Sequence, residues 1–149
     1  MTTTVAAATT TPHEDLFGPP PWVPERQIRA VLCGTYFDAI RVTPDLVRDV
    51  QRRLGYDIGP VVNSAYAGTW HFLIPLLPGA SPAWDVKGSR LLRRGTPLAL
   101  PPANVTTSRD LRWVVSPKKP LTCPRALREA LTGTDLITRP RRRSPSAPK

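Results

Sequence analysis

The side chains that could do chemistry are few, and three of them follow one another along the middle of the chain. Asp38 lies in the stretch YFDAIRV, His71 lies in GTWHFLI, and Asp85 opens DVKGSRLLRR, where an acid stands beside a run of cations. A lone strand histidine packs against its neighbours more often than it binds a ligand, and an aspartate in or beside a strand can simply face water. Each residue therefore has a structural interpretation beside a functional one.

General motifs add little to these three residues. The sequence contains no GxxxxGK[ST], GxGxxG, HExxH or GxSxG pattern. Its two cysteines, Cys33 and Cys123, lack the CxxC spacing of zinc sites, and their apolar or helix-start surroundings predict reduced, buried thiols. These motifs therefore assign no class of enzyme.

The elements that must position the three residues are mostly short strands. Apolar stretches bounded by glycine, proline and polar residues predict strands at residues 29–33, 37–42, 59–64, 68–76, 89–94, 96–101 and 111–115. A turn at residues 65–68 joins the third and fourth of these, and Gly95 is expected to join 89–94 and 96–101 as a second hairpin.

Two helices are predicted with clear ends. Residues 43–55, TPDLVRDVQRRLG, begin with an N-cap threonine and a proline, repeat apolar residues at helical spacing and stop at glycine. Residues 122–133, TCPRALREALTG, repeat this plan, with Thr122 or Cys123 as the cap. About six strands with two helices indicate an α+β fold, with an antiparallel or mixed sheet and the helices on one face.

The ends of the chain differ in composition from its middle. Residues 1–24 are rich in threonine, alanine and proline, which predicts a disordered leader, and residues 139–149 carry five cations, three prolines and no acid, which predicts a disordered basic tail. The folded domain is therefore expected at residues 25–138. No secretion signal or membrane span is recognised, since proline interrupts the longest apolar run, and the chain is expected to be cytoplasmic without a membrane partner.

The net charge of +10 favours a polyanionic partner. Nucleic acid is the natural candidate, because phosphates bind lysine and arginine with release of counterions. The alternative is compositional, since GC-rich genomes encode arginine- and proline-rich proteins whatever their function.

The order of the three segments resembles the bifunctional DNA primase/polymerase domain of the archaeo-eukaryotic primase superfamily, in particular small actinobacterial relatives. That family has an apolar strand ending in Asp-x-Asp, a histidine strand after a glycine-rich turn, and an Asp-Val-Arg-Gly segment with a glycine hairpin and Ala-Pro-Pro. AGTWHFLI matches through Gly68, His71 and Phe72. The third segment matches through Asp85, Val86, Gly88, Gly95, Pro101 and Pro102. LRWVV follows where the family continues with a Tyr-Arg-Trp strand, so that the resemblance covers residues 31 to 115.

The resemblance implies a site as well as a fold. It places Asp38 and Asp85 where catalytic carboxylates hold Mg²⁺ or Mn²⁺ against nucleotide phosphates, and His71 where the family contacts the nucleotide. The cations expected to bind nucleic acid are Lys87, Arg90, Arg93 and Arg94 around the second hairpin and Arg141, Arg142 and Arg143 in the tail. Alternatively, the hairpin cations form a solvated edge that prevents strands from pairing.

The chain departs from the family at one decisive position. Two residues after Asp38 the family has a second acid on the same strand face, and this chain has Ile40. Elements that precede the acidic strand in full-length relatives are also replaced by the leader. We therefore expect a degenerate or truncated relative without polymerising activity, which binds nucleic acid or nucleotide. Two alternatives remain: residual metal-dependent nucleotidyl transfer, and a protein-interaction or regulatory domain that docks through its PPPW segment or its tail.

Overall fold

The computed structural model describes residues 18–79 and 83–133, and the predictions for residues 1–17 and 134–149 lie outside this part of the chain. The α+β class is confirmed. The described residues form seven strands, which are β1 (Arg29–Leu32), β2 (Asp38–Val42), β3 (Val61–Ser64), β4 (Thr69–Ile74), β5 (Ser89–Leu91), β6 (Pro97–Leu100) and β7 (Arg112–Val115). The helices are α2 (Pro44–Leu54) and α3 (Pro124–Thr132), with a short 3-10 turn at Gly55–Asp57.

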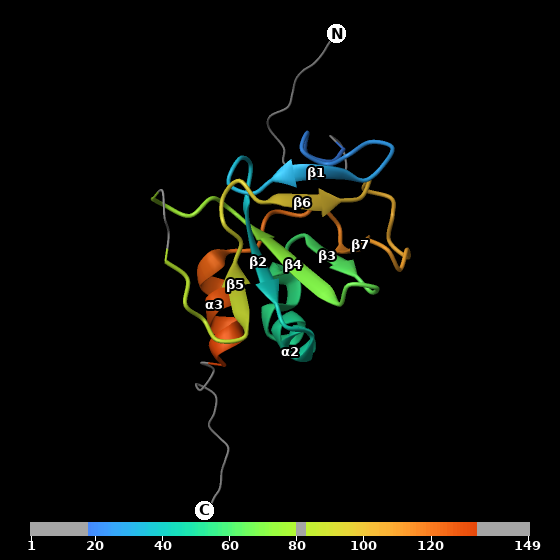
Figure 1. Cartoon of the computed structure of the whole chain (residues 1–149). Helices are drawn as coiled ribbons and strands as arrows, with labels where there is room; N and C mark the ends of the chain where they lie inside the picture. The colour runs from blue at the N-terminus through green and yellow to red at the C-terminus, as the bar shows by residue number, and fades with distance from the viewer. Residues whose placement is uncertain (1–17, 80–82, 134–149) are drawn as a thin grey trace, which may run out of the picture.

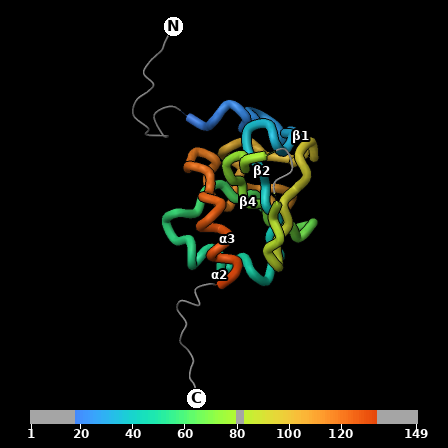
Figure 2. The backbone as a smooth tube through the Cα atoms, turned by 90° about the vertical axis from the view of Figure 1, so that its left-hand side faces the viewer, coloured from blue at the N-terminus to red at the C-terminus, as the bar shows by residue number. Residues whose placement is uncertain are grey.

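The strands form two sheets, and all their pairs are antiparallel. The larger sheet has the order β5-β2-β4-β3-β7, and β1 pairs with β6 in a separate two-stranded sheet. Figure 1 shows β1 and β6 at one end of the molecule and α2 and α3 at the other, with the larger sheet between them. Figure 2, turned by 90°, shows the same separation of β1 from the two helices.

One predicted hairpin is wrong. Strands β5 and β6 flank the turn at Gly95, but β5 pairs with β2 in the larger sheet and β6 pairs with β1. The physical reason is a competing set of main-chain hydrogen bonds. The Gly95 N–H donates to the Cys33 carbonyl at 2.8 Å, and the Cys33 N–H donates to the Thr96 carbonyl at 2.9 Å. The chain after Gly95 is therefore joined to the end of β1.

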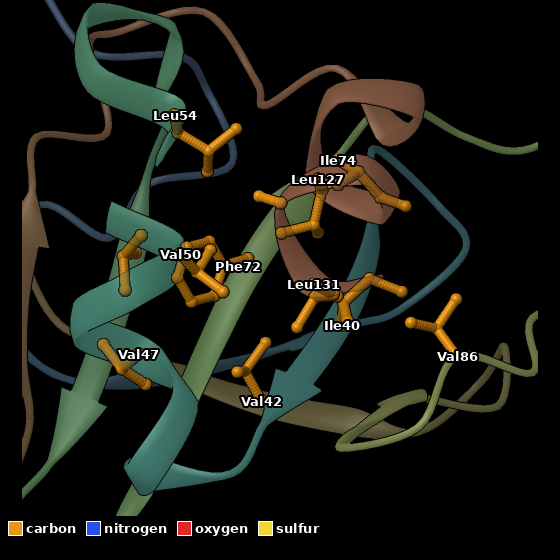
Figure 3. Close-up of a cluster of buried hydrophobic side chains, with 12 residues drawn as sticks. Ile40, Val42, Val47, Val50, Leu54, Phe72, Ile74, Val86, Leu127 and Leu131 are labelled. Carbon is orange, nitrogen blue, oxygen red and sulfur yellow. The ribbon is translucent and has the colours of Figure 1, made fainter. Parts of the chain in front are cut away.

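Both helices pack on one face of the larger sheet. Each begins with a proline at its first turn, and apolar residues at helical spacing face the strands. Neither cap residue, Thr43 or Cys123, makes a side-chain capping bond. The resulting core, drawn in Figure 3, joins the helices to β2 and β4 through Ile40, Val42, Val47, Val50, Leu54, Phe72, Ile74, Leu127 and Leu131.

A second core lies on the opposite face of the sheet, beneath β1 and β6. Trp22 packs edge-on against Phe37 at a ring separation of 5.0 Å and lies 6.4 Å from Trp113, and Val23 is buried beside them. The leader boundary predicted at residue 24 is therefore wrong for residues 18–24, because the tryptophan of the PPPW segment packs in this core. Cys33 is buried as expected, whereas Cys123 is exposed.

Candidate nucleic-acid interface

Asp38 is fully buried and both of its oxygens are bound within the protein. Its Oδ2 accepts hydrogen bonds from Arg94 Nη2 at 2.9 Å and from the Leu77 N–H at 2.8 Å, and its Oδ1 accepts one from Arg94 Nε at 3.2 Å. A buried carboxylate requires such partners, because desolvation otherwise makes its charge costly. The arrangement stabilises the start of β2 and leaves Asp38 without a free oxygen for a metal ion.

Arg94 is held in the same cluster and is not a free cation. Its guanidinium also donates to the Leu77 carbonyl at 2.6 Å and to the Gly79 carbonyl at 2.8 Å. Its aliphatic part lies against Gly34, where a Cβ atom would overlap the arginine side chain. We therefore assign Arg94 to the structure of the fold, although the sequence had placed it among the cations that bind nucleic acid.

Asp38 and His71 lie on opposite faces of the larger sheet. Asp38 pairs with Ile74 and shares its side with Ile40 and Val42, which pack against the helices. His71 pairs with Arg41, one residue out of phase with Ile40, and side chains alternate along a strand. The two side chains therefore do not meet in the single site that the resemblance implies.

Asp85 does not complete a metal site with them. It is an exposed residue of the segment that leads into β5, and its neighbour Val86 is buried in the helix-facing core. Within residues 18–79 and 83–133, no group of three or more His, Cys, Asp or Glu side chains could hold a metal ion. The residues present do not fit the Mg²⁺ or Mn²⁺ centre that the resemblance implies.

A basic row crosses three neighbouring strands on the face away from the helices. Arg90 on β5 lies directly opposite Arg41 on β2, and Arg41 lies directly opposite His71 on β4. Cross-strand partners project from the same face of a sheet. Both arginines are exposed, and no ion pair joins either of them to a carboxylate among the described residues.

Arg41 was missed by the sequence analysis, although a signal for it exists. In DAIRV the alternation of apolar residues places Ile40 and Val42 toward one core, so that Arg41 must face the other way. The pairing of β2 with β4 and β5, which local sequence does not specify, then brings the arginine between His71 and Arg90.

His71 is uncharged at neutral pH. Burial first, and the nearby positive charge of Arg41 second, lower the pKa of His71 from 6.5 to about 4. A neutral imidazole can donate one hydrogen bond and accept another, so that this end of the row adds polarity and no charge at pH 7.

A pocket opens beside the two arginines, where β2 ends and α2 begins. Thr43 borders it, and its hydroxyl makes no capping bond to the helix. The Thr43 N–H donates to the Gly88 carbonyl at 3.0 Å, which fixes the segment before β5 against the end of β2. The pocket is lined by Arg41, Val42, Thr43, Pro44, Gly68, Gly88, Ser89 and Arg90, which are cationic, hydroxyl-bearing, apolar or glycine residues without a carboxylate.

The remaining predicted cations are dispersed. Lys87 and Arg93 are exposed, and Lys87 lines a different pocket between α2 and α3. Residues Arg141–Arg143 lie outside the described part of the chain. Of the predicted cations that lie within the described residues, Arg90 alone belongs to the row with Arg41 and His71.

Comparison with known proteins adds no relative. No family model, no curated protein and no solved structure matches the chain. Neither helix of the described ranges is long and apolar enough to cross a membrane. The resemblance to the primase/polymerase domain therefore stays a prediction.

Proposed function

We propose that the protein binds nucleic acid through phosphate contacts at Arg41 and Arg90 on the open part of the larger sheet. The observation that carries this proposal is that the two arginines lie directly opposite each other on adjacent strands. Like charges in this position destabilise a sheet, and no ion pair among the described residues offsets them. A bound phosphate would relieve the repulsion and use the pair.

The pocket beside the arginine pair favours a phosphate over a carboxylate as the bound group. The Thr43 hydroxyl borders the same pocket without a capping bond to the helix, and hydroxyl groups commonly bind phosphate oxygens. Such contacts position a nucleic-acid backbone without reading its sequence. We therefore expect binding that depends on salt and tolerates changes of sequence.

This proposal keeps the nucleic-acid part of the sequence-based hypothesis and moves its site. The hypothesis placed binding around a second hairpin and the basic tail, whereas the arginine pair lies on the adjacent strands β2 and β5. Residual nucleotidyl transfer gains no support from Asp38, because its carboxylate is committed to Arg94 and Leu77.

Fluorescence anisotropy with labelled single-stranded and duplex oligonucleotides over a range of salt concentrations tests the proposal. The variant Arg41→Gln/Arg90→Gln is compared with Arg48→Gln/Arg125→Gln, which removes the same charge from exposed positions on the two helices. The logarithm of the association constant falls linearly with the logarithm of the salt concentration. We expect the first variant to reduce the steepness of this line by about 1.4 on single strands or about 1.8 on duplex. The second variant should retain the wild-type slope.

The contribution of the basic tail to binding is measured in the same assay with the variant Arg141→Gln/Arg142→Gln/Arg143→Gln in the full chain. Loss of binding that adds to that of the Arg41/Arg90 variant would show two independent contributions. Equal losses in the sheet and helix variants would mean that binding follows net charge alone and would contradict the proposed site, as would an absence of binding by the wild-type protein.

A further inference from the structure

The outer face of the two-stranded sheet is apolar throughout. Leu98 and Leu100 of β6 point into the second core, so that the residues between them, and those opposite on β1, point outward. Ile28 precedes β1 in the same alternation and is 47% exposed, and Leu32 is 51% exposed. All five outward residues are exposed and none is charged, and they are Ile28, Ala30, Leu32, Pro97 and Ala99.

Strand β1 also has an unpaired edge within the described part of the chain. Its pairs are with β6 alone, and no other described main-chain group bonds to Arg29–Leu32. Proteins commonly protect such an edge with proline, lysine or a bulge. Strand β6 begins with Pro97, whereas β1 has no proline and its four pairs with β6 run without a shift of register. Of the two strands, β1 is the one that could accept a further strand.

The charges around this face favour one kind of occupant. Arg26 and Arg29 are exposed at the start of β1 beside one exposed acid, Glu25. Arg93 is exposed in the turn that hydrogen-bonds near the end of β1, so that cations outnumber acids around this face. A second copy of this chain would bring the same cations together, in a protein whose net charge is already +10. An extended segment with acidic residues at its ends would pair them with opposite charges.

We propose that β1 and the outward residues Ile28, Ala30, Leu32, Pro97 and Ala99 form a docking site for an extended, acid-flanked segment of a partner protein, added as a third strand. Main-chain hydrogen bonds to the edge of β1 supply affinity, and alternate apolar side chains of the segment cover the outer face. A two-stranded sheet is the least stable size of sheet, so that a third strand would also stabilise this layer. The site is separate from the nucleic-acid interface and does not depend on it.

A display library of random peptides, long enough to pair with the whole of β1, tests the proposal on the full chain. The enriched peptides should alternate apolar residues and carry Asp or Glu near their ends. Each is then measured by anisotropy against the wild-type protein, Leu32→Lys, and the control Leu76→Lys, which changes another exposed leucine that is not part of the proposed site. We expect Leu32→Lys to weaken binding about tenfold or more and Leu76→Lys to leave it unchanged.

Two further measurements identify the mode of binding and the occupant. Bound peptide should slow deuterium exchange of the β1 amides. The variant Arg26→Gln/Arg29→Gln should lower the affinity for peptides, and the loss should increase with the number of acidic residues at their ends. Sedimentation equilibrium of the free protein should give a monomer. A dimer abolished by Leu32→Lys would overturn the choice of occupant, and a library without peptides sensitive to Leu32→Lys would overturn the docking site.

Discussion

Among single residues, the two aspartates singled out by the sequence have opposite environments. Asp38 is fully buried and bound to Arg94, whereas Asp85 is exposed ahead of β5. The same residue type therefore serves the stability of the fold in one place and is free to face solvent in the other. The difference arises from alternation along β2, which turns Asp38 toward the helix-facing side.

This difference predicts unequal effects on stability. Asp38→Ala should lower the free energy of unfolding by roughly 3 kcal/mol, because it leaves the Leu77 N–H and the Arg94 guanidinium without their acceptor. Asp85→Ala, the matched control, should change it by less than about 0.5 kcal/mol. Urea denaturation at neutral pH measures both. In a double-mutant cycle, Asp38→Ala and Arg94→Ala should be less than additive; equal effects of the two aspartate substitutions would contradict the structural role of Asp38.

His71 predicts a dependence of stability on pH. Its pKa is about 4 in the folded protein and near 6.5 when the chain is unfolded, so that the unfolded state binds more protons between these values. The stability contribution is complete above pH 6.5 and is lost as the pH falls toward 4. Between pH 6.5 and pH 4, the free energy of unfolding of His71→Gln should fall by roughly 2 kcal/mol less than that of the wild-type protein. This value allows for the partial exposure of the ring.

The measurement is the difference in unfolding free energy between wild-type protein and His71→Gln at a series of pH values. Carboxylates titrate in part of the same pH range. Because both proteins contain the same carboxylates, subtracting one unfolding free energy from the other removes the carboxylate contribution. Parallel curves for the two proteins from pH 6.5 to 4 would show that His71 does not titrate with a lowered pKa.

At the level of elements, the position of α3 depends on a close approach at Gly59. The Gly59 N–H donates to the buried Thr122 Oγ1 at 2.7 Å, just before α3 begins. A Cβ atom at position 59 would overlap the main chain of residues 120–122. Because backbone cannot move aside as a flexible side chain can, this contact fixes the segment that enters α3 against the segment that enters β3.

Gly59→Ala should therefore destabilise the protein by roughly 2 kcal/mol through overpacking. The control is Gly95→Ala, where φ is +92° and no atom lies within 4 Å of the added Cβ, so that only the backbone conformation is strained. Thermal denaturation of the two variants separates these causes. A smaller loss in Gly59→Ala than in Gly95→Ala would mean that the approach of α3 adapts easily.

For the whole molecule, the local sequence predicted where helices and strands lie better than it predicted which strands pair and which side chains pack together. Helix α2 was predicted because its cap position, proline, apolar spacing and terminal glycine all lie within residues 43–55. The hairpin across Gly95 was wrong because hydrogen bonds to Cys33, distant in sequence, decide where β6 pairs. The packing of Trp22 depends in the same way on Phe37 and Trp113.

The candidate site was predictable to a similar degree. The exposure of Arg41 follows from alternation in β2, but its position opposite Arg90 depends on the strand order, which local sequence does not specify. The partner of Asp38 is 56 residues away in sequence, and no local pattern indicates it.

Ile40 has a consequence for how this protein could evolve. Its side chain is fully buried among Phe72, Leu127 and the other residues of the helix-facing core. An aspartate there would have to lose its water without a partner, at a cost of several kcal/mol, comparable with the whole stability of a small domain. Natural selection would remove such a variant before the new carboxylate could bind anything. A lineage carrying this chain could therefore acquire a paired acidic centre on β2 only after its helices had been remodelled, and no single substitution leads there.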